Sequence, residues 1–402
     1  MKEVVYIGNF KLSKEDAESQ LVLGNAYAFR EMGYPVTLIG NDNSLASESI
    51  VSSKRAIDGF TSYNVSFSKS LQHLTGSRIE KQIESILDDL DVFMVVAYGS
   101  LGLSSSFYRL AKYCKKRGAL FVPNCVDLSS THHGNPFARA IKTVDRKLRY
   151  RITSEKADGI IAVSEYIKNY FASKTMVPIV VVPPLRDKTG FLPPERKMGD
   201  LVKLVYAGVP FPVDGRNVSE EAYKDRLDIA IECLSLLSAD VSFTFDIYGI
   251  TESEYLSVVP QHEKNIQSLG GRIAFHGRVS QTEIRHVLAN ADYTLLLRST
   301  NQMTMAGFSS KLVDSICAGV PVITTHTSDY GTYLSSEKHC FFIDLDESKT
   351  DRLAEILSLG RDRIEAARQA CFEFALFDYR FHIEALLEFV SSCKERASER
   401  FE

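Results

Sequence analysis

The chain has 402 residues, of which 45% are hydrophobic and 24% charged, and its formal net charge is −4. At about 150 residues per domain, this length predicts two to three domains, and the composition excludes a largely disordered chain. The small acidic excess excludes a nucleic-acid binder that works by bulk charge. The seven cysteines form no Cys-x-x-Cys pair, so we expect no disulfide framework or structural zinc site, and reduced thiols in the cytoplasm.

The first half of the chain alternates short apolar segments with longer amphipathic ones. Continuous apolar strands between helices predict a parallel sheet that is covered on both faces. The N-terminus begins directly in such a strand without a signal-peptide pattern, and no apolar stretch is long enough to span a membrane. The expected strands are Val4–Ile7, Val36–Ile39, Val92–Ala97, Ala119–Val122, Gly159–Val163 and Ile179–Val182, with helices at Ala17–Met32 and Phe107–Lys116.

Proline pairs and a charged run then interrupt the pattern, which restarts after about residue 200. The sequence therefore predicts an α/β fold of two Rossmann-like, doubly wound domains, 1–190 and 200–374, facing a cleft. A C-terminal helix within 375–402 is expected to pack back on the first domain. The later strands are expected at Leu204–Ala207, Phe243–Tyr248, Arg272–Phe275, Tyr293–Leu297, Val320–Thr324 and Phe341–Ile343, and the later helices at Leu353–Phe374 and Phe381–Arg396.

The segment from Ala306 to Ile323 predicts a loop, a helix from about Ser309, a glycine stop and a strand. A helix N-terminus offers free N–H groups and a positive dipole end, which suit a phosphate. Lys311 adds a charge in the first turn, and Asp314 shares its helix face and is placed to accept ribose hydroxyls. An ordinary capped helix with a solvated lysine and aspartate explains the same pattern.

This segment resembles the nucleotide-sugar signature of retaining, family-four GT-B glycosyltransferases (glycosyltransferase group 1). Gly307-Phe308, Asp314 and Ala318–Ile323 match, whereas Ala306 stands in place of the usual first acidic residue. A subgroup from bacterial surface-polysaccharide pathways has Ser/Thr-Lys inside the motif, as in Ser310-Lys311. The resemblance implies a GT-B fold and metal-independent transfer of a hexose with retention. The donor would be a UDP- or GDP-linked sugar and the acceptor a glycan or an isoprenoid-linked sugar, with no cofactor.

The resemblance also implies roles for particular residues. Lys224, Lys311 and the amides of Ser309 and Ser310 would hold the diphosphate, and Asp314 would bind the ribose. Arg298 follows an apolar strand and favours a ligand contact, with a salt bridge to Asp292 or another acid as the alternative. The full set of expected donor-binding residues is Gly208, Lys224, Arg298, Gly307, Phe308, Ser309, Ser310, Lys311 and Asp314.

Two further groups are expected to border the cleft. Asp127, His132 and His133 follow a strand of the first domain, and together with Lys224 and Lys311 they form the expected catalytic group. A surface loop without a catalytic role is the alternative for the first three. The Gly8–Asn9 loop is expected after the first strand on the acceptor side. No metal site is apparent.

A basic amphipathic helix is expected over about 137–152. Its cations are Arg139, Lys142, Arg146, Lys147, Arg149 and Arg151, and its apolar residues are Phe137, Ile141, Val144 and Leu148. Such a helix suits an anionic membrane surface, which would make the protein peripheral on the inner face of the membrane. The alternative is a helix whose apolar face packs on its own domain.

Three other functions remain open. Loss of the first acid at Ala306 is compatible with a catalytically silent nucleotide-sugar-binding subunit, which would bind a donor without turning it over. The basic helix is compatible with a membrane-surface adaptor. A nucleotide-sugar 2-epimerase would need acidic and basic catalytic residues that the sequence does not identify.

Overall fold

The computed structural model describes residues 2–41, 54–65, 79–99, 101, 103–128, 136–193, 201–214, 219–220 and 223–399. The chain divides into two compact units. The first unit comprises Met1–Arg186, Ala306–Phe308 and Asp378–Glu402, and the second comprises Asp187–Met305 and Ser309–Phe377. The chain thus passes from the first unit to the second after Arg186, within the interrupted segment, which begins at Pro183 and Pro184.

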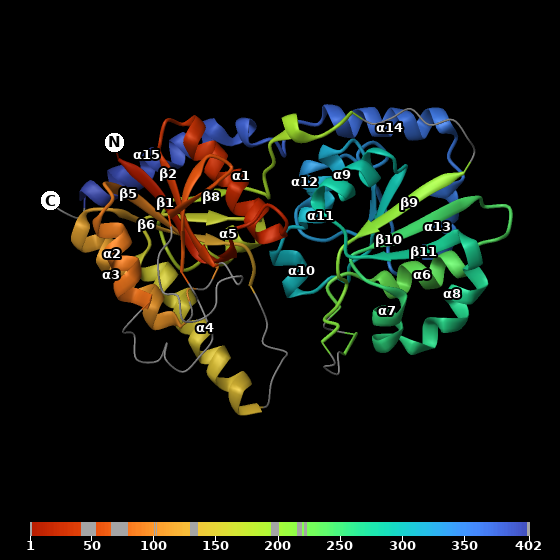
Figure 1. Cartoon of the computed structure of the whole chain (residues 1–402), viewed down its shortest axis with the longest axis horizontal. Coiled ribbons are helices and arrows are strands. Elements are labelled where there is room, and N and C mark those ends of the chain that lie inside the picture. The colour runs from red at the N-terminus through yellow and green to blue at the C-terminus, as the bar shows by residue number, and fades with distance from the viewer. Residues whose placement is uncertain are drawn as a thin grey trace. The chain divides into compact units, whose positions relative to one another are not determined.

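The first unit is built on a sheet of eight described strands in the order β3-β4-β2-β1-β5-β6-β7-β8, covered by helices (Figure 1). The strands are β1 (Glu3–Lys11), β2 (Val36–Asn41), β3 (Lys54–Ile57), β4 (Phe60–Asn64), β5 (Val92–Tyr98), β6 (Leu120–Cys125), β7 (Ile160–Ala162) and β8 (Ile179–Val181). The helices are α1 (Ala17–Glu31), α2 (Ile79–Asp88), α3 (Ser104–Arg117), α4 (Pro136–Lys156), α5 (Glu165–Ala172) and α15 (Ile383–Glu399).

Continuous apolar runs form the central strands because both faces of the sheet are covered. Val4, Val5, Tyr6 and Ile7 of β1 are all completely buried. Neighbouring described strands pair in parallel, except at the β3–β4 edge. The parallel α/β architecture expected from the sequence is therefore confirmed for this unit.

The antiparallel hairpin of β3 and β4 was not expected. Its turn holds Asp58 at φ 52° and Gly59 at φ 80°. Positive φ at both central residues is the mark of the two-residue hairpin turn that Asp-Gly favours. The dipeptide was a local signal for this hairpin, but the flanking strands are too short to show a clear hydrophobic period.

Gly8 and Asn9 were expected in a loop, and this prediction is wrong. Both lie inside β1, where Gly8 itself pairs with Tyr98 and the strand still pairs beyond Asn9, at Lys11 with Asn41. A Cβ at Gly8 would lie 2.5 Å from the backbone oxygen of Tyr98, so glycine is required there by the close approach of β5. The side chain of Asn9 is exposed and accepts a hydrogen bond from Asn41.

The second unit has a sheet whose six described strands are all parallel, in the order β11-β10-β9-β12-β13-β14. The strands are β9 (Val202–Ala207), β10 (Phe243–Tyr248), β11 (Ile273–Gly277), β12 (Tyr293–Leu296), β13 (Val322–Thr324) and β14 (Cys340–Phe342). The helices are α6 (Leu227–Leu236), α7 (Glu252–Val258), α8 (Glu263–Leu269), α9 (Gln281–Ala289), α10 (Gln302–Ala306), α11 (Ser310–Cys317), α12 (Tyr330–Tyr333), α13 (Lys349–Leu357) and α14 (Arg361–Glu373).

The prediction of a single helix over Leu353–Phe374 is wrong, because two helices cover this segment. The structure breaks it into α13 and α14 at Ser358–Gly360, and Gly360 takes the extended conformation of an N-cap residue. A glycine inside a helical pattern weakens the helix, which favours a break at this position.

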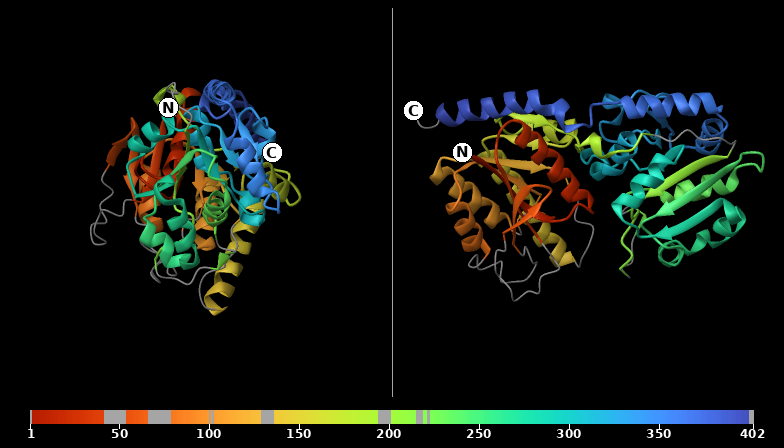
Figure 2. Two further views of the ribbon diagram at one scale, coloured as in Figure 1. Left: turned by 90° about the vertical axis from the view of Figure 1, so that its right-hand side faces the viewer. Right: turned by 45° about the horizontal axis from the view of Figure 1, so that its top comes forward.

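Helix α15 packs on the first unit, although it follows the second unit in the chain (Figures 1 and 2). Lys394 donates to the hydroxyl of Tyr34 at 3.3 Å, and Arg396 donates to the carbonyl of Met176 at 3.0 Å. A Cβ at Gly159 would lie 2.4 Å from the sulfur of Cys393, so the helix sits directly against this glycine.

Replacement of Gly24 in α1 tests the packing of the first unit. A Cβ there would lie 2.3 Å from the backbone oxygen of Leu185, so we expect Gly24→Ala to destabilise the protein by about 1–3 kcal/mol through overpacking. Gly331→Ala is the matched control, because nothing lies within 4 Å of a Cβ there. It should leave stability unchanged or raise it by about 0.4–1 kcal/mol. Urea unfolding followed by circular dichroism measures both, and an equal effect of the two substitutions contradicts the packing.

Candidate functional site

The order of strands in the second unit indicates where a ligand would bind. From β9 the chain adds β10 and β11 on one side and then adds β12, β13 and β14 on the other. In such open sheets, ligands bind beyond the carboxyl ends of the strands where the order reverses. The switch lies between β9 and β12, so the segments that follow these two strands form the candidate site.

A buried carboxylate, Asp225, lies at this switch point and is 1% exposed. Its Oδ2 accepts hydrogen bonds from Nζ of Lys311 at 2.8 Å and from the hydroxyl of Tyr206 at 2.9 Å. Its Oδ1 lies 3.2 Å from Nε of Arg298, which donates to the carbonyl of Lys224 at 3.3 Å. We call Asp225, Lys311, Arg298 and Tyr206 the Asp225 cluster.

The chain around Asp225 is held across the ends of both central strands. The amide of Lys224 donates to the carbonyl of Pro210, beyond β9, and the amide of Arg226 donates to the carbonyl of Leu297, beyond β12. Arg226 is the N-cap residue of α6 and donates to both carboxylate oxygens of Asp228, through Nε to Oδ1 at 2.9 Å and through Nη2 to Oδ2 at 2.6 Å. These backbone hydrogen bonds thus fix Asp225 between the ends of β9 and β12, independently of its side-chain contacts.

The cations of the cluster keep Asp225 ionised. Burial alone would raise the pKa of Asp225, but the charges of Lys311 and Arg298 outweigh burial and lower this pKa to about 2. Burial and the adjacent carboxylate raise the pKa of Tyr206 well above its ordinary value, so this phenol stays protonated and donates. With two cations to one anion, the cluster has a positive excess that suits an anionic ligand.

Gly208 is required for the position of Lys311. A Cβ at Gly208 would lie 1.8 Å from Cε of Lys311, so the aliphatic part of the lysine lies directly on this glycine. Lys311 comes from the first turn of α11, and its side chain is 21% exposed. The end of β9 and the start of α11 are therefore locked together by one side chain.

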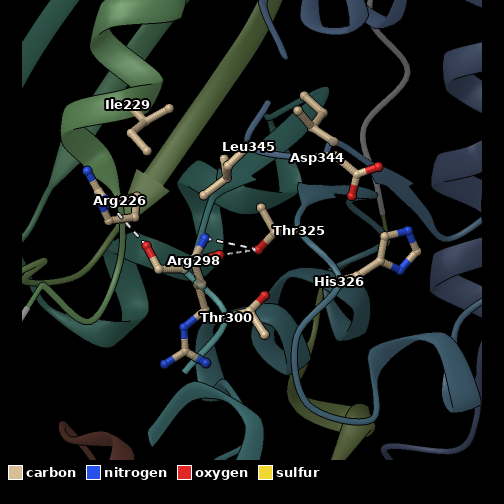
Figure 3. Close-up of a pocket in the computed structure, with 10 residues that line it drawn as sticks. Arg226, Ile229, Arg298, Thr300, Thr325, His326, Asp344 and Leu345 are labelled. Atoms are coloured by element: carbon tan, nitrogen blue, oxygen red, sulfur yellow. Dashed lines mark hydrogen bonds between the residues drawn. The ribbon is translucent and has the colours of Figure 1, made fainter. Parts of the chain in front are cut away.

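A pocket of about 390 Å³ opens at the carboxyl ends of β12, β13 and β14 (Figure 3). Figure 3 shows Arg226 and Ile229 on one side of it and Asp344 and His326 on the other. Arg226 donates to Ser299 at 3.0 Å, and the ring of His326 stacks on Phe342. The lining residues are Arg226, Ile229, Arg298, Ser299, Thr300, Thr325, His326, Ile343, Asp344 and Leu345.

Among the expected donor-binding residues, Arg298 makes a salt bridge rather than presenting a free cation. Its side chain is 2% exposed, and besides Asp225 it contacts the hydroxyl of Tyr330 at 3.1 Å. Figure 3 shows its guanidinium turned away from Leu345 and Asp344. The geometry therefore supports the alternative for Arg298, a salt bridge to an acid. That acid is Asp225 and not Asp292, which pairs with Arg361.

The structure places Gly208, Lys224, Arg298 and Lys311 at the switch point. Lys224 is exposed and immediately precedes Asp225. Ser309 is the N-cap residue of α11 without a side-chain hydrogen bond to the helix. Gly307 and Phe308 group with the first unit. Ser310 is the first residue of α11, and Asp314, one turn later in this helix, is half-buried.

The expected catalytic group of the first domain is described only in part. Asp127 is exposed and follows β6 in the first unit. His132 and His133 lie outside the described residues. Within the described part of the chain, no three His, Cys, Asp or Glu side chains gather as a metal site.

Sequence reasoning missed Asp225 and Tyr206 as site residues. Asp225 directly follows Lys224, an expected donor-binding residue, which was a usable signal for its place in the chain. Its burial and its pairing with Lys311, 86 residues away, have no local sequence signal. Tyr206 looked like an ordinary residue of an apolar strand.

Comparison with solved structures shows the GT-B fold. Sucrose-phosphate synthase from Thermosynechococcus elongatus is similar with a TM-score of 0.72 and 10% identity, over 97% of this chain and 98% of that one. HepE of Anabaena, in complex with UDP, has a TM-score of 0.66 and 14% identity, over 97% and 100%. WaaG, a glycosyltransferase involved in lipopolysaccharide biosynthesis, has a TM-score of 0.61 and 13% identity, over 95% and 99%.

The fold and the cluster thus define a two-unit GT-B protein with a cationic site in its second unit. Residues 215–359 match the model of the family described as glycosyl transferases group 1. This segment holds Asp225, Arg298 and Lys311, and together with the shared fold it supports a GT-B glycosyltransferase. A comparison with curated proteins found no match.

Acid unfolding tests the ionised state of Asp225. A carboxyl whose pKa is lower in the folded protein stabilises it fully above the unfolded value, and this stability is lost as the pH falls through the folded value. We therefore expect Asp225 to contribute about 2 kcal/mol above pH 4, lost between about pH 4 and pH 2. Urea midpoints measured across this range should fall more steeply for the wild type than for Asp225→Asn. Parallel curves contradict the assignment.

Proposed function

We propose that the protein transfers a sugar from a nucleotide-diphosphate donor to a carbohydrate acceptor. The observation that carries the proposal is the positive excess of the Asp225 cluster at the switch point of the unit that matches the glycosyltransferase model. A diphosphate leaving group needs positive charge at its place of departure, and the cluster offers that charge in a largely buried setting. Anabaena HepE, which has the same fold, has been crystallised with UDP and with UDP-glucose, which supports a nucleotide-sugar donor.

The donor would lie along the segment that follows β9 and the start of α11. Lys311 and Lys224 would neutralise the diphosphate together with the amides of Ser309 and Ser310, and Asp314 would accept the ribose hydroxyls. Helix α11 adds the positive end of its dipole at the same place. We propose a UDP- or GDP-linked donor and transfer that needs no metal ion, since lysines and amides would stabilise the leaving group.

Catalysis would rest on orientation and on electrostatic stabilisation of the departing diphosphate. For the retaining reaction that we propose, an oxygen of the leaving phosphate takes the proton of the acceptor hydroxyl as the new glycosidic bond forms. No dedicated protein base is then needed. Asp127, His132 and His133 are proposed as catalytic residues that contact substrate, because the resemblance implies a loop at this place that faces the donor sugar.

Removal of the Lys311 ammonium tests donor binding. Lys311→Ala should weaken the binding of the preferred nucleoside diphosphate by about 1.5–3 kcal/mol, because a charge-assisted contact is lost. Lys264→Ala removes an exposed lysine of α8 and is the control. Thermal shift of UDP, GDP, ADP, dTDP and CMP against the wild type selects the ligand, and calorimetry gives the affinities.

Three outcomes distinguish a transferase from a catalytically silent binding subunit and from a protein without a donor site. If the wild type binds none of these nucleotides, or if Lys311→Ala binds as tightly as Lys264→Ala, the donor site is contradicted. Binding and donor turnover in the wild type support a transferase. Binding without any turnover, in the presence of acceptor extracts, supports the catalytically silent subunit that Ala306 suggested.

We also propose that the acceptor is presented at an anionic membrane surface through α4. The apolar residues of this helix recur at a spacing of three to four and form one stripe. The structure leaves this stripe uncovered, with Phe137 75%, Ile141 51%, Val144 57% and Leu148 46% exposed. These exposed fractions speak against the alternative, in which the stripe packs on its own domain. The described part of the chain contains no helix that is both long and apolar enough to cross a bilayer.

Helix α4 is anchored to the first unit beside the stripe, at Asp145, and on its other side, at Tyr150 and Thr153. Asp145 accepts hydrogen bonds at 2.8 Å from both the amide and the hydroxyl of Ser104, at the start of α3. The ring of Tyr150 packs edge-on against Phe171 of α5, and Thr153 is buried. Figures 1 and 2 show the amino-terminal half of α4 extending beyond the other described elements of this unit.

The charge of α4 favours anionic lipid as the partner. Arg139, Lys142 and Lys147 are exposed, and Asp145, the one acid between Arg139 and Arg151, is used in the contact with Ser104. An apolar stripe with flanking cations is the pattern of a helix that lies in the headgroup region of an anionic bilayer.

Vesicle flotation tests the proposed membrane contact. Combined Phe137→Ser and Ile141→Ser should abolish binding to vesicles that contain anionic lipid, and Arg139, Lys142 and Lys147→Gln should weaken it by on the order of tenfold or more. The matched control is combined Met176→Ser and Leu236→Ser, which removes two apolar side chains that are 85% and 65% exposed elsewhere. Equal binding to neutral and anionic vesicles, or equal loss in the control, contradicts the proposal.

A further inference from the structure

The Asp225 carboxylate is more than a neutralising charge, because it fixes the direction of a lysine. Nζ of Lys311 lies 2.8 Å from Oδ2, and the same oxygen accepts from Tyr206 at 2.9 Å. Tyr206 is 1% exposed and comes from β9, so the accepting oxygen is itself held in place by a rigid strand. The ammonium is therefore bound to a fixed point.

The lysine stem is restrained independently of its ammonium. A Cβ at Gly208 would overlap Cε of Lys311, which shows that the stem lies in the space where other residues have a side chain. A free lysine loses about 2 kcal/mol of rotamer entropy when one geometry is imposed. Here the packing at Gly208 and the bond to Asp225 impose this geometry from within the protein.

Stability alone does not account for this arrangement. A buried ion pair is often no more stable than apolar side chains of the same volume, because two charges must leave water. Oδ1 of Asp225 makes no hydrogen bond, although it is buried and lies 3.2 Å from Nε of Arg298. A buried carboxylate with one oxygen that is ion-paired but not hydrogen-bonded is a cost, which is compatible with a role in placing the cations.

We propose that Asp225 is the positioning residue of the donor site, which holds the Lys311 ammonium at the switch point where the diphosphate departs. The inference rests on the proposed function. The carboxylate itself is buried and would not touch the donor. It acts through Lys311, whose ammonium keeps hydrogens for phosphate oxygens while one hydrogen is bonded to Oδ2.

This role predicts a separation of binding from turnover. Asp225→Asn removes a negative charge next to Lys311, so the site becomes more positive and long-range attraction for a diphosphate is not weakened. The ammonium, however, loses its fixed partner, and it would no longer meet the departing phosphate in one geometry. A misplaced group costs turnover more than ground-state binding.

The experiment compares Asp225→Asn with Asp292→Asn. Asp292 is an equally buried carboxylate of the same unit and pairs with Arg361 at 2.7 Å. It precedes β12, so it lies at the amino ends of the strands, away from the candidate site at their carboxyl ends. Both variants should lower the melting temperature. Only Asp225→Asn should reduce kcat, by at least about tenfold, with the donor KM and the pyrophosphate Kd within about threefold of the wild type.

The converse results overturn the inference. A raised donor KM with unchanged kcat in Asp225→Asn would mean that the carboxylate supports binding alone. An equal loss of kcat in Asp292→Asn would mean that both substitutions act through stability. Failure of the wild type to bind nucleotide or to turn over donor is a different result, which contradicts the proposed function.

Acetylation of amines in the ligand-free wild type tests the Lys311 position without any donor or variant. We expect acetic anhydride to modify Lys311 at least tenfold more slowly than exposed Lys224, as followed by peptide mass spectrometry, because the ammonium is held by Asp225. Lys264 gives the rate of an ordinary surface lysine. Equal rates for Lys311 and Lys264 overturn the inference even if Asp225→Asn does not fold.

Discussion

The second unit is organised around one buried negative charge. A carboxylate removed from water must be paired, or it would be protonated or the fold would pay several kcal/mol. Asp225 meets this requirement with Lys311 and Arg298, which come from α11 and from the end of β12, and with Tyr206 of β9. Three segments that are distant in the chain are thereby held at the point where the strand order reverses.

This constraint explains why the cations near the site differ in what they can do. The guanidinium of Arg298 is enclosed by Asp225, Tyr330 and the carbonyl of Lys224, so it supports the structure of the site. The ammonium of Lys311 is partly exposed and can share its hydrogens with a ligand. Burial, rather than residue type, separates the two roles.

The first unit carries a different kind of feature. Its core is an ordinary covered parallel sheet, but α4 presents an uncovered apolar stripe beside several cations. Scattered apolar residues on a surface need no explanation, whereas a contiguous stripe indicates an interaction site. Polar contacts at Asp145, beside the stripe, and aromatic packing at Tyr150, on the opposite side, hold the helix, so the stripe is exposed on a fixed element.

The sequence by itself determined the parallel α/β architecture, the central strands and the start of a helix at about Ser309, because apolar periodicity and helix-start signals act over a few residues. It did not determine the continuation of β1 through Gly8 and Asn9, since that depends on the approach of β5. Tertiary structure alone decided that Asp225 meets Lys311, that Arg298 is buried, and that the stripe of α4 faces outward. Pairing between residues 86 apart and the burial of a helix face depend on how elements pack, and no local pattern encodes that packing.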